Sequence, residues 1–350
     1  MSGYFSPKYR ELSPYVPGEQ PKDRKYVKLN TNESPFPPSP LALEYAARAL
    51  TDLNLYSDPD CTELRRRIAL TYGVTPDCVI CGNGSDDILS FAFSAYCDGD
   101  TPAVFADITY GFYRVFAARE RVPSRIVPLK DGFRIDPADY HNAEGTVFIA
   151  NPNAPTGIAL TVGEIEGILK SNEKNVVVID EAYVDFGAES CVPLVKKYGN
   201  LLITQTFSKS RSLAGGRLGF GIADPGLIRD LDTVRCSINP YNVNAVTQAA
   251  GVGTLSDGEY TAENCKKIIK TRAYLTDRLA SLGFRLTDSR ANFVFAKHES
   301  TGGDVLCAKL REKGVLVRRF DTERIRDHLR ITVGSDEQTE KLLRAIGEIL

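Results

Sequence analysis

The sequence predicts an α/β protein with three parts: a large domain with a mostly parallel sheet flanked by helices, a small α+β C-terminal domain, and an extended N-terminal arm. Short, continuously apolar runs alternate with helical segments over residues 77–205, which is typical of a parallel sheet covered on both faces. After Pro240 the pattern changes to a long helical segment followed by mixed strands and helices. The first forty residues are rich in proline, tyrosine and asparagine and predict an extended segment.

These changes of pattern set the expected domain boundaries. The arm covers residues 1–38, the large domain residues 39–242 and the small domain residues 243–350. A chain of 350 residues is long enough for a large domain and a smaller one, each with its own apolar core.

The large domain is expected to alternate between helices and strands. Helices are predicted at residues 41–50, 62–72, 88–96, 110–119 and 162–169. Strands are predicted at residues 77–81, 103–106, 146–150, 176–179 and 201–205. In the small domain, one long helix is expected over residues 243–282. The remaining elements predicted there are strands at 292–296, 315–317 and 329–333 and helices at 304–313 and 337–350.

Composition and charge argue against several classes of function. The net charge is −2 and no block of lysine or arginine stands out, so neither a nucleic-acid partner nor a membrane surface is expected. No apolar run approaches the roughly 20 residues of a membrane-spanning helix. Residues 1–10 lack the apolar segment of a secretory signal. The eight cysteines are scattered, which favours reduced thiols and a cytoplasmic protein.

No metal site is expected. Cys78 and Cys81 form a CxxC pair, but residues 77–81 are typical of a short buried strand and no second pair follows. The three histidines show no metal-ligand spacing and lie near no nucleophile elbow. The acid–base group of an enzyme is therefore expected to be of another type.

Charged residues follow two of the apolar runs. Ligands of parallel α/β sheets bind beyond the carboxyl ends of the strands. Asp180 directly follows the strand at 176–179, and Lys209 comes shortly after the strand at 201–205. Both are costly to bury without a partner. Farther along, Arg217 stands among glycines, which allow a ligand to approach the backbone.

An anion site is predicted where Gly84, Ser85 and Asp86 open a helix, because free N–H groups and the positive dipole end suit a phosphate. Taken singly, each feature has an ordinary explanation: the aspartate as a helix N-cap, the lysine as an exposed loop residue, the arginine as a surface residue and the glycines as a tight turn. In combination, in order along the chain, they predict one bound molecule.

Pyridoxal 5′-phosphate matches this combination. It needs a lysine for an imine, a carboxylate that keeps its ring nitrogen protonated, donors for its phenolic oxygen and a cradle for its phosphate. Lys209, Asp180 and the helix start at Ser85 would meet three of these needs.

The chain also resembles the fold type I, aspartate-aminotransferase-like pyridoxal-phosphate enzymes. The resemblance runs from the arm motifs LSPYVPG at 12–18 and LNTNE at 29–33 to LRITVG at 329–334, and so covers nearly the whole chain. Within this family it is similar to the histidinol-phosphate aminotransferases. The resemblance implies a fold type I architecture and a homodimer with a shared active site.

The resemblance further implies roles for individual residues. Lys209 forms the imine, Asp180 pairs with the ring nitrogen and Tyr183 donates a hydrogen bond to the phenolic oxygen. Tyr110 stacks on the ring, and Tyr56 reaches the phosphate bound by the partner subunit. The other cofactor-binding residues implied in this way are Gly84, Ser85, Asp86, Thr206, Ser208 and Arg217.

The implied substrates are small molecules, an amino donor and a 2-oxo acid. Arg330 binds the α-carboxylate of glutamate, while Arg330, Arg318 and Tyr15 are candidates for a substrate phosphate, and Asn32 is also expected in the substrate site. The implied reaction is transamination between L-histidinol phosphate and 2-oxoglutarate in histidine biosynthesis, which gives imidazole-acetol phosphate and L-glutamate.

One position departs from the family pattern Asn-Pro-Thr-Gly, whose asparagine donates to the phenolic oxygen. The run at 151–157 is NPNAPTG, which places Ala154 at the position of that asparagine. Asn153 is predicted to supply the amide instead, with Asn151, or Tyr183 alone, as the alternatives. An unreplaced hydrogen bond to a charged oxygen costs about 1.5–3 kcal/mol.

Other functions use the same residues or the same fold. An aminotransferase for aromatic or other amino acids and a threonine-phosphate decarboxylase are the near alternatives, and the Tyr15 arm and the LRITVG motif favour the reaction above. A ligand-sensing module of a gene regulator needs a DNA-binding domain, for which little length is expected to remain. A catalytically inactive homologue is disfavoured because Lys209, Asp180, Tyr183 and Arg217 are all present.

Overall fold

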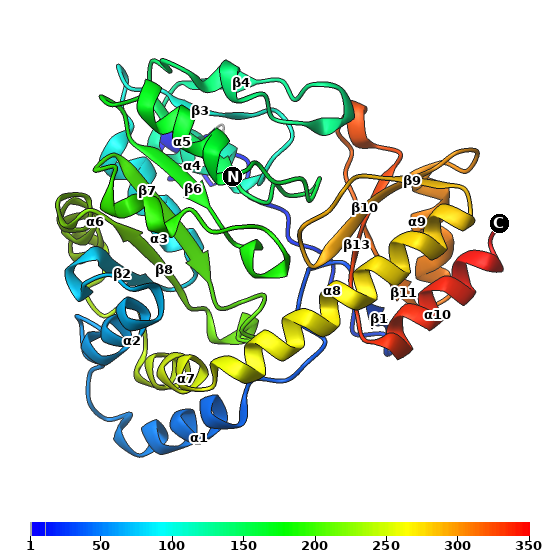
Figure 1. Ribbon diagram of the computed structural model, residues 1–350, viewed down its shortest axis with the longest axis horizontal. Helices are drawn as coiled ribbons and strands as arrows, with labels where there is room; N and C mark the ends of the chain where they lie inside the picture. Colours follow the sequence, from blue (N-terminus) through cyan, green and yellow to red (C-terminus); the bar gives the residue numbers. More distant parts are fainter. Residues whose placement is uncertain (1, 11) are drawn as a thin grey trace.

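A seven-stranded sheet lies at the centre of the large domain (Figure 1). In the computed structural model, which describes residues 2–10 and 12–350, its strands are β2 (Val79–Gly82), β3 (Ala103–Ala106), β4 (Ser124–Val127), β5 (Thr146–Ala150), β6 (Val177–Asp180), β7 (Leu201–Thr206) and β8 (Gly219–Ala223). Their spatial order is β2-β8-β7-β6-β5-β3-β4. β8 is antiparallel to both of its neighbours, and the other strands run in one direction. The mostly parallel sheet predicted from the sequence is confirmed.

Helices cover both faces of this sheet. They are α1 (Pro40–Ala49), α2 (Thr62–Tyr72), α3 (Ser85–Tyr96), α4 (Phe112–Glu120), α5 (Val162–Ser171), α6 (Pro225–Ile238) and α7 (Ala245–Ser256). Successive strand residues point to opposite faces, so that in β5 Val147 and Ile149 join one apolar core and Phe148 joins the other. Helices α2, α5 and α7 contribute to the first core, and α3, α4 and α6 to the second.

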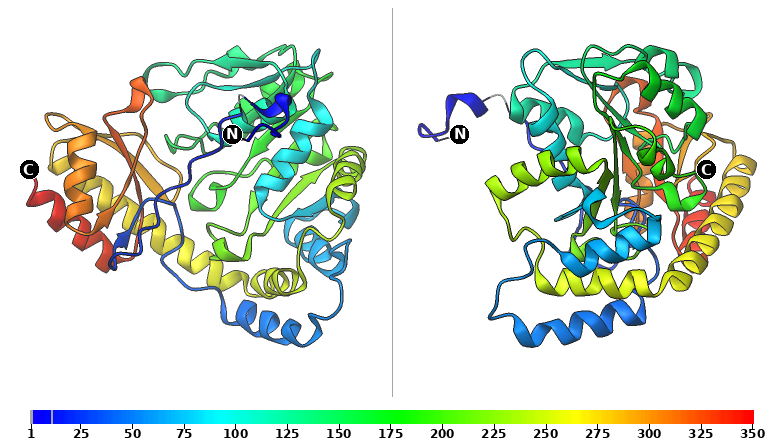
Figure 2. Two further views of the ribbon diagram at one scale, coloured as in Figure 1. Left: turned by 180° about the vertical axis from the view of Figure 1, so that it is seen from behind. Right: turned by 60° about the vertical axis from the view of Figure 1, so that its left-hand side comes forward.

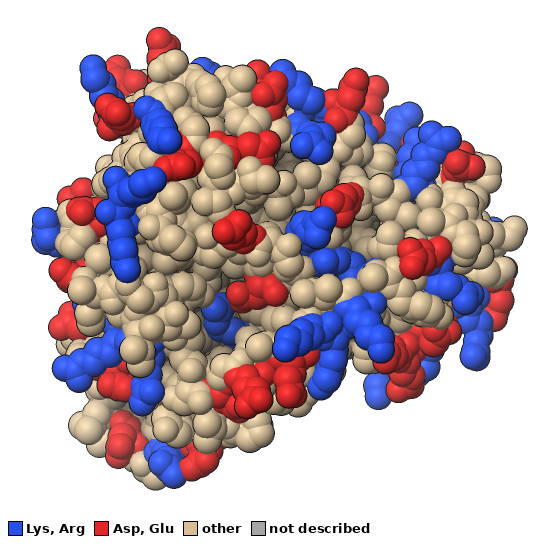
Figure 3. All heavy atoms as spheres, viewed as in Figure 1, with Lys and Arg blue, Asp and Glu red and all other residues tan. Residues whose placement is uncertain are grey.

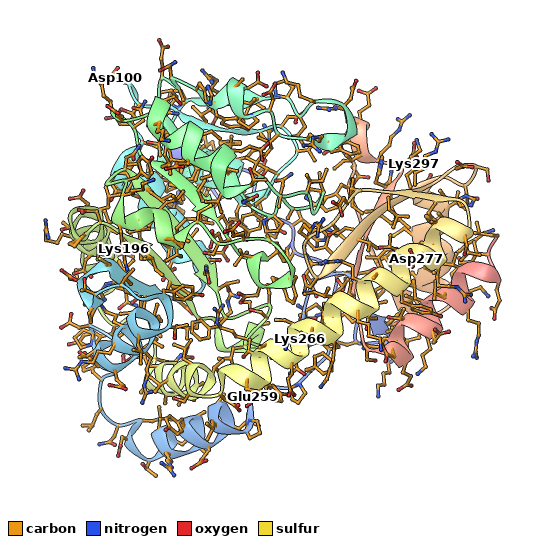
Figure 4. All side chains as sticks on the ribbon, viewed as in Figure 1. Asp100, Lys196, Glu259, Lys266, Asp277 and Lys297 are labelled. Carbon is orange, nitrogen blue, oxygen red and sulfur yellow. The ribbon has the colours of Figure 1, made fainter. Side chains whose placement is uncertain are left out.

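The small domain has an antiparallel sheet of four strands. Its elements are α8 (Gly258–Ser281), β9 (Phe284–Leu286), β10 (Phe293–His298), α9 (Gly303–Glu312), β11 (Val315–Leu316), β12 (Arg318–Arg319), β13 (His328–Thr332) and α10 (Asp336–Gly347). The strand order is β12-β13-β10-β9. Helix α8 runs from the large domain to the small one, with Glu259, Lys266 and Asp277 along its exposed side (Figure 4).

The arm is hydrogen-bonded to the small domain. Its strand β1 (Val27–Lys28) pairs in parallel with β11. Arg24 donates hydrogen bonds to the carbonyl oxygens of Arg311 and Glu312 at 2.6 and 2.8 Å. The turn at Pro7–Tyr9 projects away from the rest of the chain (Figure 2).

Helix α7 differs from the expectation. The prediction of one helix over residues 243–282 is wrong. The chain forms α7 and α8 there, which are separated at Asp257 (φ −120°, ψ 51°). Aspartate and the following Gly258 are poor helix formers. Because α7 packs against α1 and α2, it lies with the large domain. The boundary at residue 243 stays a prediction, and this packing favours one near Asp257.

The strands β1, β4, β8, β9 and β12 and the helix α6 were not predicted. β8 is not recognisable as a strand from its sequence, because Gly219 and Gly221 have low strand propensity. The structure explains Gly219 by close packing: a Cβ atom there would lie 2.2 Å from the backbone nitrogen of Ser85. This contact brings β8 against the start of α3.

Charges of both signs are interspersed over the face shown in Figure 3. Within residues 2–10 and 12–350, none of the helices combines the length and the apolar character needed to cross a bilayer.

Candidate active site

A pocket lies beyond the carboxyl ends of β5, β6 and β7, at the start of α3. Its lining residues are Ser85, Asp86, Tyr110, Ala150, Pro152, Ala154, Asp180, Ala182, Tyr183, Thr206, Ser208, Lys209 and Arg217. Nine of the expected cofactor-binding residues are therefore brought together. A larger cavity of about 600 Å³ lies between the two domains, but no lysine lines it and none of the expected site residues does.

Lys209 reaches this pocket from the loop that follows β7. Its Nζ donates a hydrogen bond to the carbonyl oxygen of Thr31 at 3.1 Å. Burial, together with the nearby Arg330, lowers the pKa of Lys209 to about 8, against the opposing charges of Glu33 and Asp86. A substantial fraction of this amine is therefore neutral near physiological pH.

Asp180 is the last residue of β6 and is 4% exposed. Its Oδ2 accepts a hydrogen bond from the hydroxyl of Tyr113, and its Oδ1 accepts one from the backbone N–H of Ala182, both at 3.2 Å. Burial raises the pKa of this carboxyl to about 7. Because it forms no ion pair within the described part of the chain, Asp180 is suited to a cationic partner in the pocket.

Tyr183 follows Asp180 by three residues and is held by Asn32. The Nδ2 of Asn32 donates a hydrogen bond to the Tyr183 hydroxyl at 3.0 Å. The Oδ1 of Asn32 accepts one from the Thr332 hydroxyl, also at 3.0 Å. Burial raises the pKa of Tyr183, so that the phenol keeps its proton and can donate it in a hydrogen bond. Asn32 thus holds the Tyr183 hydroxyl in place through a hydrogen bond.

The start of α3 and Arg217 form one side of the pocket. Nη2 of Arg217 lies 3.2 Å from Oδ2 of Asp86, and the hydroxyl of Tyr110 donates to Oδ1 of Asp86 at 2.7 Å. Gly84 has φ +93°, and a Cβ atom there would lie 2.6 Å from Nη2 of Arg217. Only glycine lets the arginine approach the first turn of α3, beside Ser85.

These groups fit pyridoxal 5′-phosphate by their chemistry. A buried amine with a lowered pKa, Lys209, shares the pocket with a buried carboxyl, Asp180, that lacks a cation. The N-terminus of α3 and Arg217 supply donors for a phosphate. Tyr183 supplies a neutral donor for a phenolic oxygen.

The prediction that Asn153 replaces the missing family asparagine stays a prediction, and the hydrogen bonds of this residue disfavour it. Its Nδ2 donates to the carbonyl oxygen of Ile108 at 3.0 Å and to the hydroxyl of Thr156 at 3.1 Å, and its Oδ1 accepts from Thr109. The N–H groups of the Asn153 amide are therefore already used in hydrogen bonds to Ile108 and Thr156. Asn151 is likewise occupied, because its amide exchanges hydrogen bonds with the backbone of Leu160.

Arg330 and Arg318 of the small domain are hydrogen-bonded to the N-terminal arm. Arg330 donates from Nη2 to the carbonyl oxygen of Asn30 at 3.0 Å, and its buried Nε has no hydrogen-bond partner among the described residues. Its guanidinium lies 5.5 Å from the ring centre of Phe293. Nη groups of Arg318 instead donate to the arm carbonyls of Val16 and Pro17 at 3.0 and 3.2 Å.

Tyr15 and Tyr56 lie outside the lining of the pocket. The ring of Tyr15 stacks on Phe112 with 4.4 Å between centroids and lies 6.4 Å from that of Tyr110. Tyr56 is 83% exposed and stacks on Tyr241 at 4.5 Å. Its exposure leaves it accessible to a second copy of the chain.

Tyr113 was not predicted as a site residue, although its hydroxyl donates a hydrogen bond to the carboxylate of Asp180. The available signal was its spacing of three residues from Tyr110 within the helix predicted at residues 110–119. In the structure Tyr110 lies just before α4, and the two ring centroids are 5.7 Å apart. The lining residues Ala150, Pro152 and Ala182 carried no chemical signal.

Known proteins resemble this chain over almost its whole length. The model of the family "Aminotransferase class I and II" matches residues 24–346. Histidinol-phosphate aminotransferase 1 of Bradyrhizobium diazoefficiens is 49% identical over 350 residues, which are 100% of both chains. The histidinol-phosphate aminotransferase of an Acinetobacter baumannii strain is 48% identical over 99% of this chain and 97% of its own. The histidinol-phosphate aminotransferase of Sinorhizobium meliloti, solved in complex with pyridoxal 5′-phosphate, matches with a TM-score of 0.90 at 25% identity, over 100% of this chain and 98% of that chain.

Proposed function

Because the chain belongs to the family of class I and II aminotransferases, we propose that it catalyses transamination between L-histidinol phosphate and 2-oxoglutarate. The products are imidazole-acetol phosphate and L-glutamate, and the reaction belongs to histidine biosynthesis. The full-length relatives named histidinol-phosphate aminotransferase support this substrate. The observation that carries the chemistry is the buried Lys209 amine, with its pKa lowered to about 8, in one pocket with Asp180 and Tyr183.

The cofactor is pyridoxal 5′-phosphate, which when bound supplies an electron sink for the carbanion at the substrate's Cα. Lys209 holds it through its amine, and the carboxylate of Asp180 keeps the ring nitrogen protonated. Tyr183 donates a hydrogen bond to the phenolic oxygen. Arg217 and the first turn of α3 at Ser85 bind the phosphate, with Ser208 and Thr206 beside them.

Lys209 also moves the proton of the reaction. With the cofactor in place and Nζ free, this amine would take the proton from the substrate's Cα and would hold it for its return later in the reaction. Burial lowers the pKa of Lys209 to about 8, so that the amine both accepts and releases a proton near neutral pH. A fully exposed lysine would be protonated and unable to act as a base.

Arg330 binds the anionic end of each substrate. Its planar guanidinium bonds a carboxylate or a phosphate in bidentate fashion, which suits glutamate in one half of the reaction and a phosphate ester in the other. The unpartnered Nε supports this role, because a buried donor needs an acceptor. The ring of Tyr15, in the arm, lies 6.4 Å from that of Tyr110, which lines the pocket, and Arg318 holds the arm in place through Val16 and Pro17.

The active enzyme is a homodimer in this proposal. Leu50, Leu53 and Leu55, shortly before Tyr56, are more than half exposed, and so is Ile238, three residues before its stacking partner Tyr241. Such exposed apolar side chains favour burial against a second copy. Tyr56 then reaches the phosphate in the partner's site. The eight free cysteines favour a cytoplasmic location.

Mixing two inactive variants tests the shared site. Lys209→Ala and Tyr56→Ala remove one required group each, so we expect each protein alone to lose most of its activity. A mixed dimer has one complete site, and random mixing restores roughly a quarter of the wild-type activity. If each subunit builds its own site, mixing restores nothing.

The substrate is tested with the cofactor-loaded protein and L-histidinol phosphate alone, without a 2-oxo acid. We expect the visible band of the lysine-bound cofactor to be replaced by that of pyridoxamine phosphate. Lys209→Ala should retain bound cofactor without turnover. A band that is insensitive to L-histidinol phosphate but responds to an aromatic amino acid would contradict the proposed substrate, and release of carbon dioxide would indicate a decarboxylase.

A further inference from the structure

Asp185 joins the two loops that carry Lys209 and Tyr183. It lies two residues after Tyr183. Its Oδ2 accepts a hydrogen bond from the hydroxyl of Ser210 and lies 3.3 Å from Nη1 of Arg211. Ser210 and Arg211 directly follow Lys209 in the chain. A single carboxylate oxygen therefore contacts the first and the second residue after the lysine.

Arg211 is a rigid anchor for this contact. It is 8% exposed, and its Nη1 donates to the carbonyl oxygen of Thr206 at 3.2 Å. Its Nη2 donates to the hydroxyl of Tyr72 at 2.7 Å. The guanidinium also lies 5.2 Å from the ring centre of Phe207. These contacts fix Arg211 at the carboxyl end of β7.

The turn that carries Tyr183 is otherwise tied to the arm and to α8. Asn32 bonds the Tyr183 hydroxyl. Nη1 of Arg272, on α8, donates to the carbonyl oxygens of Phe186 and Ala291 at 2.7 and 2.6 Å. Apart from the two contacts of Asp185, no hydrogen bond within residues 2–10 and 12–350 joins this turn to the Lys209 loop.

We propose that Asp185 is a positioning residue, which holds the Lys209 amine and the Tyr183 phenol in a fixed relation to each other. The proposal rests on the function proposed above, because there the two groups act on neighbouring positions of the cofactor, the imine and the phenolic oxygen. Lys209 Nζ lies 5.8 Å from the centre of the Tyr183 ring. A displacement of about 1 Å in a reacting group lowers the rate by up to 100-fold.

The test compares three variants in the cofactor-loaded protein. Asp185→Ala removes the tie, whereas Asp185→Asn keeps an oxygen that accepts from Ser210 and Arg211. Glu166→Ala is the matched control, because Glu166 accepts hydrogen bonds from Lys197 and Tyr198 in the same domain, away from the pocket. We expect Asp185→Ala to lower kcat by about tenfold with a smaller change in KM, and Glu166→Ala to change neither.

A pH titration of the visible band separates position from charge. If Asp185 acts by position, its loss weakens the hydrogen bond from Tyr183 to the phenolic oxygen. The imine pKa then rises by about one unit in Asp185→Ala and stays near the wild-type value in Asp185→Asn. If Asp185 acts by its charge, both variants lose a stabilising anion and the imine pKa falls in both. A fall in both variants would overturn the proposal.

A double variant tests whether the effect passes through Tyr183. In the Tyr183→Phe background, Asp185→Ala should cause little additional rise of the imine pKa, because the donor is already absent. A full additional rise contradicts the proposal. If Asp185→Ala does not fold, Ser210→Ala takes its place. It removes only one of the two contacts of Asp185, so the imine pKa should rise by a smaller amount.

Hydrogen exchange of the cofactor-free protein gives a measurement that does not depend on the proposed function. Residues 207–213 should exchange faster in Asp185→Ala than in the wild type, and at the wild-type rate in Glu166→Ala. Unchanged exchange would overturn the tie itself. A second outcome is possible: residues 207–213 exchange faster in Asp185→Ala, but the wild-type protein shows no cofactor band. That outcome would contradict the proposed function and still support the contact made by Asp185.

Discussion

The hydroxyl of Tyr113 donates a hydrogen bond to the carboxylate of Asp180, with 3.2 Å between the two oxygens. Tyr113 is fully buried in α4, and Asp180 is the last residue of β6. Burial raises the pKa of Asp180 to about 7, and the hydrogen bond from Tyr113 opposes this shift. Tyr113 thus favours the charged carboxylate, which is the form that pairs with a protonated ring nitrogen.

Tyr113→Phe should therefore weaken cofactor binding by about three- to tenfold, the effect of one hydrogen bond. The dissociation constant is measured by titrating the cofactor-free protein. Tyr140→Phe is the matched control: Tyr140 is also buried, but its hydroxyl has no partner in the described part of the chain. Equal losses in both variants would contradict a specific action on Asp180.

The stability of the cofactor-free protein should fall as the pH rises towards 7. The folded pKa of Asp180, about 7, lies above its ordinary value of 3.8. Between these values the folded state binds more protons than the unfolded state, so the free energy of unfolding decreases with rising pH.

Asp180→Asn removes this dependence without changing the shape of the side chain. We expect the cofactor-free variant to match the wild type at pH 4 and to be more stable by about 2–4 kcal/mol at pH 8. Urea unfolding at the two pH values measures the difference. Glu181, whose pKa burial also raises to about 7, is present in both proteins and cancels in the comparison. A constant difference between the proteins would show that Asp180 stays charged in the fold.

Cofactor uptake should follow the titration of Lys209. Its pKa is lowered to about 8 by burial, and only the neutral amine forms an imine. The rate of uptake by the cofactor-free protein, followed by absorbance, should rise with pH up to about 8 and then level off. N-acetyl-lysine is the control, since its rate should keep rising towards pH 10. A protein profile that follows the control would mean an exposed, unperturbed amine.

Ala154→Asn should restore the hydrogen bond that this chain lacks. Ala154 lines the pocket beside Asp180 and Tyr183. An amide at this position adds a second donor to the phenolic oxygen, which stabilises its anion and lowers the imine pKa by about one to two units. The visible band measures the shift. An unchanged pKa would indicate that the new amide turns away from the pocket.

The sequence by itself determined the order of most elements and which charged residues stand at the ends of the central strands. Strands of four or five apolar residues are recognisable locally. Asp180 stands at the end of one of them, and Lys209 comes shortly after the next. Parallel strands bring their carboxyl ends to one edge, so these side chains converge by topology alone. The identification of Tyr183, Arg217 and Arg330 depended on the resemblance of motifs.

Only the tertiary structure decided how polar side chains share their hydrogen bonds. Asn153 has the right chemistry for the pocket, but its amide is satisfied by Ile108 and Thr156, because buried donors must find acceptors within the fold. The bond from Tyr113 to Asp180 joins residues 67 apart in the sequence. No local pattern encodes such a pair, since it exists only after helices and strands have packed.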